Sequence, residues 1–179
     1  MMSIHILNCK SNFMSSSHVP KLKPLNLTLQ SDVDINDFEE IETAQEIVPG
    51  LYLGSLKTLS DSQWLKLHKI THNIDLSQSK CKVDPKIKQL HINILDKSDA
   101  KICDHFETTS DYIDEALQNG GKVLVNCLKG VSRSTTIVAA YIIRKYQVSH
   151  KTAIEMIRKR RKCVAPNIGF YLALRRWSA

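Results

Sequence analysis

The sequence lacks the features that mark several classes of protein. Its 179 residues include five cysteines, an odd number without a Cys-x-x-Cys pair, which argues against a disulfide framework and a zinc cage. No window holds 18 consecutive apolar residues, and the N-terminus has no apolar segment with a small-residue cleavage site. We therefore expect neither membrane insertion nor secretion, and we predict that the protein works in the cytoplasm or the nucleus.

Composition excludes collagen-like, low-complexity and wholly disordered chains. Glycine and proline are scarce, at six and five residues, while 42% of the residues are hydrophobic and 24% are charged. These are the proportions of an ordinary globular protein, and the length suits one domain.

Acidic residues are nearly missing from the C-terminal third of the chain. Residues 121–179 hold 13 basic residues and one acidic residue, whereas residues 1–120 hold 12 basic and 17 acidic residues. The net charge of +7 favours an anionic partner or substrate. We do not expect that partner to be nucleic acid, because the basic region lacks the interleaved aromatic side chains of a base-stacking surface.

The composition changes near residue 46. Residues 1–30 are polar and show no helical or alternating period, and residues 32–46 carry seven acids and no base. We predict a flexible, partly acidic tail over residues 1–45 and a folded domain over residues 46–179.

The folded part alternates between strand-like and helix-like patterns. The apolar run Val123–Val125 is typical of a central strand covered on both faces, and the two glycines before it end a helix. Ser149 is placed to cap a later helix, which ends before Pro166. We expect strands over residues 51–53, 71–76, 89–95 and 122–126, and helices over residues 61–68, 102–117, 133–143, 149–161 and 169–177. This order predicts an α/β fold with a mostly parallel central sheet flanked by helices.

The most informative segment is KVLVNCLKGVSRSTTIVAAY, from Lys122 to Tyr141. A buried strand ends at Cys127, a short loop follows, and Arg133 opens a buried helix. In such an arrangement the backbone N–H groups of the loop can point inward and the helix dipole adds positive potential, while Gly130 permits close approach of the backbone. The predicted phosphate-binding residues are Leu128, Lys129, Gly130, Val131, Ser132 and Arg133.

Cys127 and Arg133 are chemically suited to act together at this loop. The potential of the helix end favours a thiolate at Cys127, and the planar guanidinium of Arg133 can bind two phosphate oxygens. The thiolate would attack phosphorus while Arg133 stabilises the charge on the oxygens. Ser134 can donate its hydroxyl to the sulfur when the thiolate leaves. We therefore predict that Cys127, Arg133 and Ser134 are catalytic.

The segment NCLKGVSRS resembles the signature loop of the cysteine-dependent dual-specificity phosphatases of the protein tyrosine phosphatase superfamily. Three further segments are similar to that family: EIVPGLYLGS, ITHNIDLS and APNIGFYLAL. The resemblance covers residues 46–177, the compact size of the atypical members. It implies hydrolysis of phosphotyrosine, phosphoserine and phosphothreonine in a phosphorylated protein substrate, through a phosphocysteine intermediate and without a metal or cofactor.

The resemblance also implies a general acid on a loop that precedes the nucleophile. Asp96 fits, because it directly follows the expected strand over residues 89–95 and lies ten residues before Phe106. Its carboxyl group would protonate the leaving oxygen and then activate water. Asp99 is the alternative.

One position departs from the family. Relatives have His immediately before the cysteine, whereas this chain has Asn126, which can donate a hydrogen bond but has neither the second ring nitrogen nor the charge of an imidazole. We expect Asn126 to give Cys127 a higher pKa, and the protein weaker activity, than in typical relatives. The alternative function is a weakly active or inactive pseudophosphatase module that binds phosphate.

Three basic segments leave further alternatives open. Lys129 either points to solvent or strengthens the positive potential at the substrate, which would favour a highly phosphorylated lipid such as a phosphoinositide, an RNA 5′-triphosphate or a multiply phosphorylated peptide. The run RKRRK, Arg158–Lys162, ends a helix, where cations stabilise the dipole, or forms a docking or nuclear-targeting patch. In the tail, Lys21–Leu27 resembles a kinase docking peptide, with two lysines and then two leucines, which indicates a mitogen-activated protein kinase as a partner.

Overall fold

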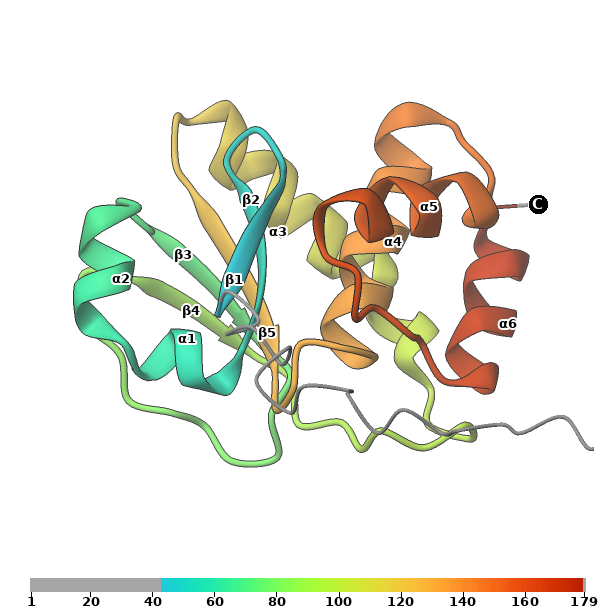
Figure 1. Cartoon of the computed structure of the whole chain (residues 1–179), viewed down its shortest axis with the longest axis horizontal. Coiled ribbons are helices and arrows are strands. Elements are labelled where there is room, and N and C mark those ends of the chain that lie inside the picture. Colours follow the sequence, from blue (N-terminus) through green and yellow to red (C-terminus); the bar gives the residue numbers. More distant parts are fainter. Residues whose placement is uncertain (1–42, 179) are drawn as a thin grey trace, which may run out of the picture. The chain divides into compact units, whose positions relative to one another are not determined.

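The computed structural model describes residues 43–178 and contains a five-stranded sheet (Figure 1). The strands are β1 (Ala44–Val48), β2 (Leu51–Ser55), β3 (His72–Asp75), β4 (Lys88–His91) and β5 (Val123–Cys127). Their order in the sheet is β1-β2-β5-β3-β4; β1 pairs antiparallel with β2, and the other pairs are parallel. The predicted α/β fold with a mostly parallel central sheet is confirmed.

Helices cover both faces of this sheet. They are α1 (Leu56–Ser60), α2 (Ser62–Leu67), the 3₁₀ helix η2 (Ile102–His105), α3 (Phe106–Gln118), α4 (Arg133–Tyr146), α5 (His150–Arg160) and α6 (Ile168–Trp177). Figure 1 shows α1 and α2 on one side of the sheet and the longer helices on the other. None of the helices between residues 43 and 178 is long and apolar enough to cross a membrane.

Alternate side chains of β5 contribute to two apolar cores. Val123 and Val125 belong to the larger core, which includes α3 and α4, whereas Leu124 packs on the opposite face with Leu59 of α1 and Leu65 of α2. All three β5 residues are fully buried. The apolar run therefore has the environment that it predicts, a central strand covered on both faces.

The edge strand β1 is not predicted by the sequence pattern. It contains Gln45 and Glu46, and only Ala44 and Ile47 are buried. A register irregularity between Glu46 and Val48 also interrupts the alternation of its side chains. The tail predicted over residues 1–45 lies almost wholly outside the described residues, so that division of the chain stays a prediction.

Strand β4 is shorter than expected, because it ends at His91 rather than at residue 95. Ile92 and Ile94 beyond it are still buried, each 8% exposed, and they contribute to the larger core. The backbone N–H of Ile92 still donates to the carbonyl of Asp75 on β3 at 2.9 Å, although neither isoleucine is part of the strand. The pattern of apolar residues therefore continues past the end of the strand. This segment beyond the strand leads directly to Asp96.

Candidate active site

The sheet and helix α4 hold one loop between them. Strand β5 ends at Cys127, residues 128–132 form the loop, and the 14-residue helix α4 begins at Arg133. Every residue of β5 is buried, and so are residues 133–143 of α4. The loop is therefore anchored at both ends, and the positive end of the helix dipole faces it.

The Cys127 thiol is buried within this loop, with 1% of the residue exposed. Its sulfur lies 3.2 Å from Ser134 Oγ, and the backbone N–H of Gly130 donates to it at 3.3 Å. Burial raises the pKa of the thiol, but hydrogen bonds from the side chain and backbone of Ser134 and from the backbone of Val131, together with the charge of Arg133, bring the pKa below its ordinary value. The environment therefore favours the thiolate, which is the nucleophilic form.

Gly130 lets the loop close around the sulfur. Its φ is +68°, and a Cβ at this position would lie 2.5 Å from the carbonyl oxygen of Gly54 on β2. Behind the loop, Arg161 Nε donates to the Gly130 carbonyl at 3.0 Å, and Arg161 Nη2 donates to the Lys129 carbonyl at 3.4 Å. Because Arg161 binds these two carbonyls on the outer side, the N–H of Gly130 is turned toward the thiol.

The guanidinium of Arg133 is held beside the loop by two backbone carbonyls. The residue is 7% exposed, and its Nη1 donates to Leu76 O at 2.8 Å and to Ile94 O at 3.1 Å. Its Nε is buried and has no hydrogen-bond acceptor among residues 43–178; Asp96 Oδ2 lies 3.8 Å from it, an ion-pair distance. A buried N–H without an acceptor is unfavourable, and an anion bound in the loop would supply one.

Asp96 is brought to the same loop. Its Oδ1 accepts hydrogen bonds from Ser132 Oγ at 2.7 Å and from Asn167 Nδ2 at 2.8 Å, and the backbone N–H of Asn167 donates to Ser132 Oγ at 3.2 Å. The Asp96 side chain keeps 35% exposure, so it borders both the loop and solvent. The carboxyl group of Asp99, the alternative, is exposed and forms no hydrogen bond or ion pair with another described residue.

Asn126 belongs to a buried polar network next to the thiol. Its Nδ2 donates to Asp75 Oδ1 at 2.9 Å, and its Oδ1 accepts from Asn73 Nδ2 at 2.7 Å. The network continues from Asn73 to Gln89, whose Nε2 donates to Asn73 Oδ1 at 3.1 Å, and from Asp75 to the backbone N–H of Ser77 at 3.0 Å. Asn126 is thus fixed by side chains of β3, the strand that pairs with β5.

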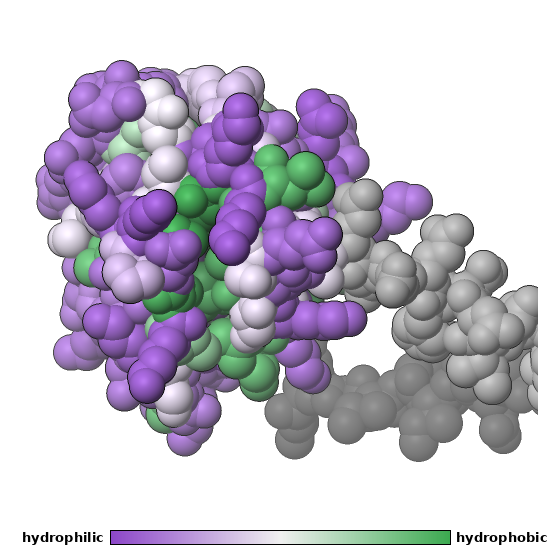
Figure 2. All heavy atoms as spheres, turned by 90° about the vertical axis from the view of Figure 1, so that its left-hand side faces the viewer, coloured by the Kyte–Doolittle hydropathy of each residue, from purple (hydrophilic) through white to green (hydrophobic). Residues whose placement is uncertain are grey.

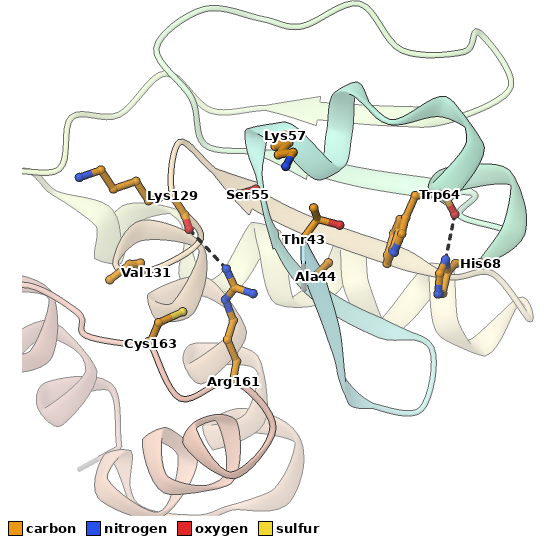
Figure 3. Close-up of a pocket in the computed structure, with 10 residues that line it drawn as sticks. All are labelled: Thr43, Ala44, Ser55, Lys57, Trp64, His68, Lys129, Val131, Arg161 and Cys163. Carbon is orange, nitrogen blue, oxygen red and sulfur yellow. Dashed lines mark hydrogen bonds between the residues drawn. The ribbon is translucent and has the colours of Figure 1, made fainter. Parts of the chain in front are cut away.

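A pocket of about 720 Å³ lies beside the loop (Figure 3). Its lining includes the basic residues Lys57, Lys129 and Arg161 and the stacked rings of Trp64 and His68, and no acidic residue between positions 43 and 178 lines it. The Lys129 side chain is exposed and extends away from the other labelled residues (Figure 3). Of the two interpretations of Lys129, the geometry favours a side chain directed to solvent.

The other predicted loop residues tie the loop to its surroundings. Leu128 is 57% exposed, and its carbonyl accepts from the backbone N–H of Leu56 at 3.3 Å, at the start of α1. The carbonyl of Val131 accepts from the N–H of Ala165 at 2.9 Å. Ser132 acts through its side chain, which links the loop to Asp96. The loop is therefore attached on both sides, to α1 and to the segment that leads into α6.

Sequence reasoning missed three residues that support the site: Asp75, Arg161 and Asn167. The basic run RKRRK is expected at the surface, but Arg161 within it is 3% exposed. One signal was available, because Arg161 continues the spacing of Ile154 and Ile157, which form the buried face of α5. Asp75 and Asn167 give no such signal, since their partners are distant in the sequence.

Comparisons with known proteins agree with this geometry. Residues 51–179 match the family described as "Dual specificity phosphatase, catalytic domain". Dual specificity protein phosphatase 1 of Arabidopsis thaliana is 30% identical over 169 residues, which are 89% of this chain and 85% of the relative. Human Dual specificity protein phosphatase 22 is 35% identical over 125 residues, 70% of this chain and 68% of the relative. The crystal structure of human tyrosine phosphatase-like serine/threonine/tyrosine-interacting protein aligns with a TM-score of 0.72 at 35% identity, over 75% of this chain and 94% of that one.

Proposed function

The chain belongs to the atypical dual specificity phosphatases of the protein tyrosine phosphatase superfamily, and from this we propose that it hydrolyses phosphotyrosine, phosphoserine and phosphothreonine in proteins. The observation that carries the proposal is the meeting of three groups at one loop: the Cys127 thiol, the buried Arg133 guanidinium with an Nε that lacks an acceptor, and the Asp96 carboxyl group. Each group has the chemistry that one part of the reaction requires.

In the first step, the Cys127 thiolate attacks the phosphorus of the bound monoester. The sulfur–phosphorus bond forms, the bond between phosphorus and the ester oxygen breaks, and Asp96 transfers its proton to the leaving oxygen. Arg133 and the loop N–H groups bind the remaining phosphoryl oxygens, over which the charge is spread during the transfer. The bound phosphoryl group gives Arg133 Nε the acceptor that no residue from 43 to 178 supplies.

In the second step, water hydrolyses the phosphocysteine. Asp96, now a carboxylate, accepts a proton from the attacking water, the new oxygen–phosphorus bond forms, and Cys127 leaves as a thiolate. Ser134 Oγ, 3.2 Å from the sulfur, donates a hydrogen bond that stabilises this leaving group. Inorganic phosphate is released, and Asp96 is protonated again for the next cycle.

Two measurements on the wild-type chain and on Cys127→Ser test this proposal. The first is turnover of p-nitrophenyl phosphate, and the second is binding of phosphotyrosine and phosphothreonine peptides. The serine variant keeps the loop but loses the nucleophile, so turnover should vanish while peptide binding persists. Undiminished turnover by Cys127→Ser would contradict the phosphocysteine mechanism.

The second candidate function is a weakly active or inactive phosphate-binding module. Asn126 supports it, because the amide places no positive charge beside the thiol, and one matched structure is that of a protein described as tyrosine phosphatase-like. Equal, negligible turnover by the wild-type chain and Cys127→Ser, with phosphopeptide binding retained, would establish this function instead.

A third candidate keeps the chemistry and changes the substrate class. The basic lining of the pocket in Figure 3, which includes Lys57 and Arg161, favours substrates that carry several negative charges. A phosphoinositide and an RNA 5′-triphosphate, assayed beside the phosphopeptides, decide between the classes. A higher kcat/KM for either of them than for the phosphopeptides would identify that class, and not a phosphorylated protein, as the substrate.

The tail and the cellular compartment are separate proposals. Lys21–Leu27 lies outside the described residues, and we propose from its sequence that it binds a mitogen-activated protein kinase. Deletion of residues 1–30 should then weaken kinase binding, and unchanged binding would contradict the proposal. Imaging of a fluorescent fusion tests the expected location in the cytoplasm or nucleus.

A further inference from the structure

A second hollow lies on the face of the sheet that α1 and α2 cover. It has a volume of about 260 Å³ and is bordered by the end of α1, by α2 with the turn after it, and by residues 82–87 before β4. We call it the α2 groove. It shares no lining residue with the pocket beside the catalytic loop. Figure 2 views the molecule from the side on which α2 lies in Figure 1, and it shows apolar surface recessed between hydrophilic side chains.

The floor of the α2 groove is apolar and well anchored. It is formed by the buried residues Leu59, Leu65, Ile70 and Ile87 and by the partly buried Val83. All five pack together in the smaller core, on the face of the sheet opposite α4. The floor is therefore preformed, and an apolar side chain that enters the groove is removed from water at little conformational cost.

The rim of the α2 groove is basic. Its four lysines, Lys66, Lys69, Lys82 and Lys86, are all exposed, and none forms an ion pair with another residue of the described range 43–178. Among the described residues, Asp84 is the one acidic residue of the lining, and its carboxylate accepts a hydrogen bond from the backbone N–H of Lys86. The lining therefore has an excess of positive charge.

On another surface of the domain, two cations are paired: Arg144 and Lys145 on α4 form ion pairs with Asp111 and Asp114 on α3, at 2.7 and 2.8 Å. Mixed signs are usual for a surface that serves only solubility. A rim of mainly positive charge around an apolar hollow is instead complementary to an acidic ligand with an apolar anchor.

We propose that the α2 groove is a docking site for an acidic segment of a partner protein that carries one or two large apolar side chains. The apolar side chains fill the floor, and the flanking carboxylates pair with the four lysines. A nucleic acid would use the lysines alone and leave the floor unoccupied. The proposal does not depend on phosphate hydrolysis, because the groove lies apart from Cys127 and its loop.

The test uses the full chain and a fluorescein-labelled synthetic peptide, EELEEFEE, with EESEESEE as the peptide without anchors. Fluorescence anisotropy at low salt should show that the first peptide binds about tenfold more tightly than the second, or better, since only the first can fill the floor. The same assays include turnover of p-nitrophenyl phosphate, which groove variants should leave unchanged. Normal peptide binding by a chain without turnover would leave the docking site intact and contradict only the enzymatic proposal.

Matched variants separate the α2 groove from the general charge of the protein. Lys66→Glu combined with Lys82→Glu should weaken EELEEFEE by about tenfold or more, whereas Lys151→Glu combined with Lys159→Glu, the same charge change on exposed positions of α5, should leave its affinity unchanged. Val83→Ser should weaken binding of EELEEFEE more than Val148→Ser does. Both valines are partly buried, but only Val83 lines the α2 groove. Thermal unfolding of each variant verifies that it is folded.

Three outcomes would overturn the proposal. Equal binding of the two peptides would show that the floor takes no part. Equal loss of binding in the two lysine double variants would show a non-specific basic surface. A single-stranded oligonucleotide that displaces the peptide and binds Val83→Ser as tightly as the wild-type chain would assign the lysines to nucleic acid instead.

Discussion

Asn126, the residue directly before Cys127, donates a hydrogen bond from Nδ2 to Asp75 Oδ1 at 2.9 Å. Both residues are fully buried, and they lie opposite each other on the parallel strands β5 and β3. The hydrogen bond therefore joins two neighbouring strands at the point where β5 ends and the catalytic loop begins. An amide held in this way fixes the backbone from which the loop starts, which is part of the work that an imidazole does in relatives.

The first prediction concerns Asp75. Asp75→Ala leaves Asn126 Nδ2 and the N–H of Ser77 without their acceptor, so the free energy of unfolding should fall by about 2–4 kcal/mol. Urea denaturation measures this change. Asp84→Ala is the matched control, since Asp84 also accepts a backbone N–H but is exposed; we expect a loss below about 1 kcal/mol. Equal losses would contradict the role of the network.

Replacing Asn126 by histidine tests why this chain departs from its family. Asn126→His introduces a ring that can carry positive charge beside the sulfur, which should lower the Cys127 pKa further. A lower pKa means that half of the thiol is ionised at a lower pH, so the profile of iodoacetate inactivation should move to lower pH. Superimposable profiles for the wild-type chain and Asn126→His would contradict this prediction.

Ser134 should control both the ionisation and the departure of the thiolate. Its side-chain hydrogen bond is the strongest of the influences that lower the Cys127 pKa against the effect of burial. Ser134→Ala should therefore move the alkylation profile to higher pH and reduce kcat by about tenfold, with phosphoenzyme accumulating. Thr135→Ala, which removes a buried hydroxyl without a hydrogen-bond partner in the described range, should change neither.

The assignment of the general acid is tested by a pair of aspartates. Asp96→Asn should lower kcat by about 10²–10⁴, with the larger effect on substrates whose leaving groups need a proton, such as phosphoserine. Asp99→Asn should keep wild-type kcat, because its carboxyl group is exposed and forms no hydrogen bond or ion pair with another described residue. Steady-state rates on an aryl phosphate and on a phosphoserine peptide supply the comparison. A loss in Asp99→Asn alone would reverse the assignment.

Arg161 is expected to act as a positioning residue. Arg161→Lys keeps the charge but cannot reach the carbonyls of Lys129 and Gly130 with the same fork of donors, so the loop N–H groups lose their fixed orientation. We expect weaker inhibition by vanadate and a fall of about tenfold in kcat/KM. Arg160→Lys, one residue earlier and exposed, should show neither effect. Vanadate inhibition that stays unchanged in Arg161→Lys would show that the role is not one of positioning.

Site residues that lie close together in the sequence are predictable from it, whereas residues with distant partners are not. Cys127, Gly130, Arg133 and Ser134 fall within eight consecutive positions, so their spacing alone indicates an anion loop with a nucleophile. Asp96 needed the resemblance to a family, because it meets the loop across 36 positions. Arg161 contacts Gly130 across 31 positions, and Asn126 contacts Asp75 across 51, so no local pattern identifies these partners. The helical spacing of Arg161 indicates only that its side chain is buried.

The strands of the sheet differ in the same way. Apolar runs such as Val123–Val125 predicted the central strands, because burial on both faces leaves a strong signal. The edge strand β1 escaped prediction, since its pairing with β2 is decided by backbone hydrogen bonds and only two of its side chains enter the core. The opposite error occurs at Ile94, where the apolar pattern predicts a strand and the structure has none.

The hydrogen bond between Asn167 and Asp96, which spans 71 positions, also sets an order of events during synthesis. A ribosome makes the nucleophile, the guanidinium and the acid before it reaches the residues that orient them, Arg161 and then Asn167. A nascent chain, which folds from its N-terminal end as it emerges, would hold a reactive cysteine without a positioned acid until that last stretch leaves the exit tunnel. Under the proposed function, the acid is thus positioned late, when the segment before α6 docks.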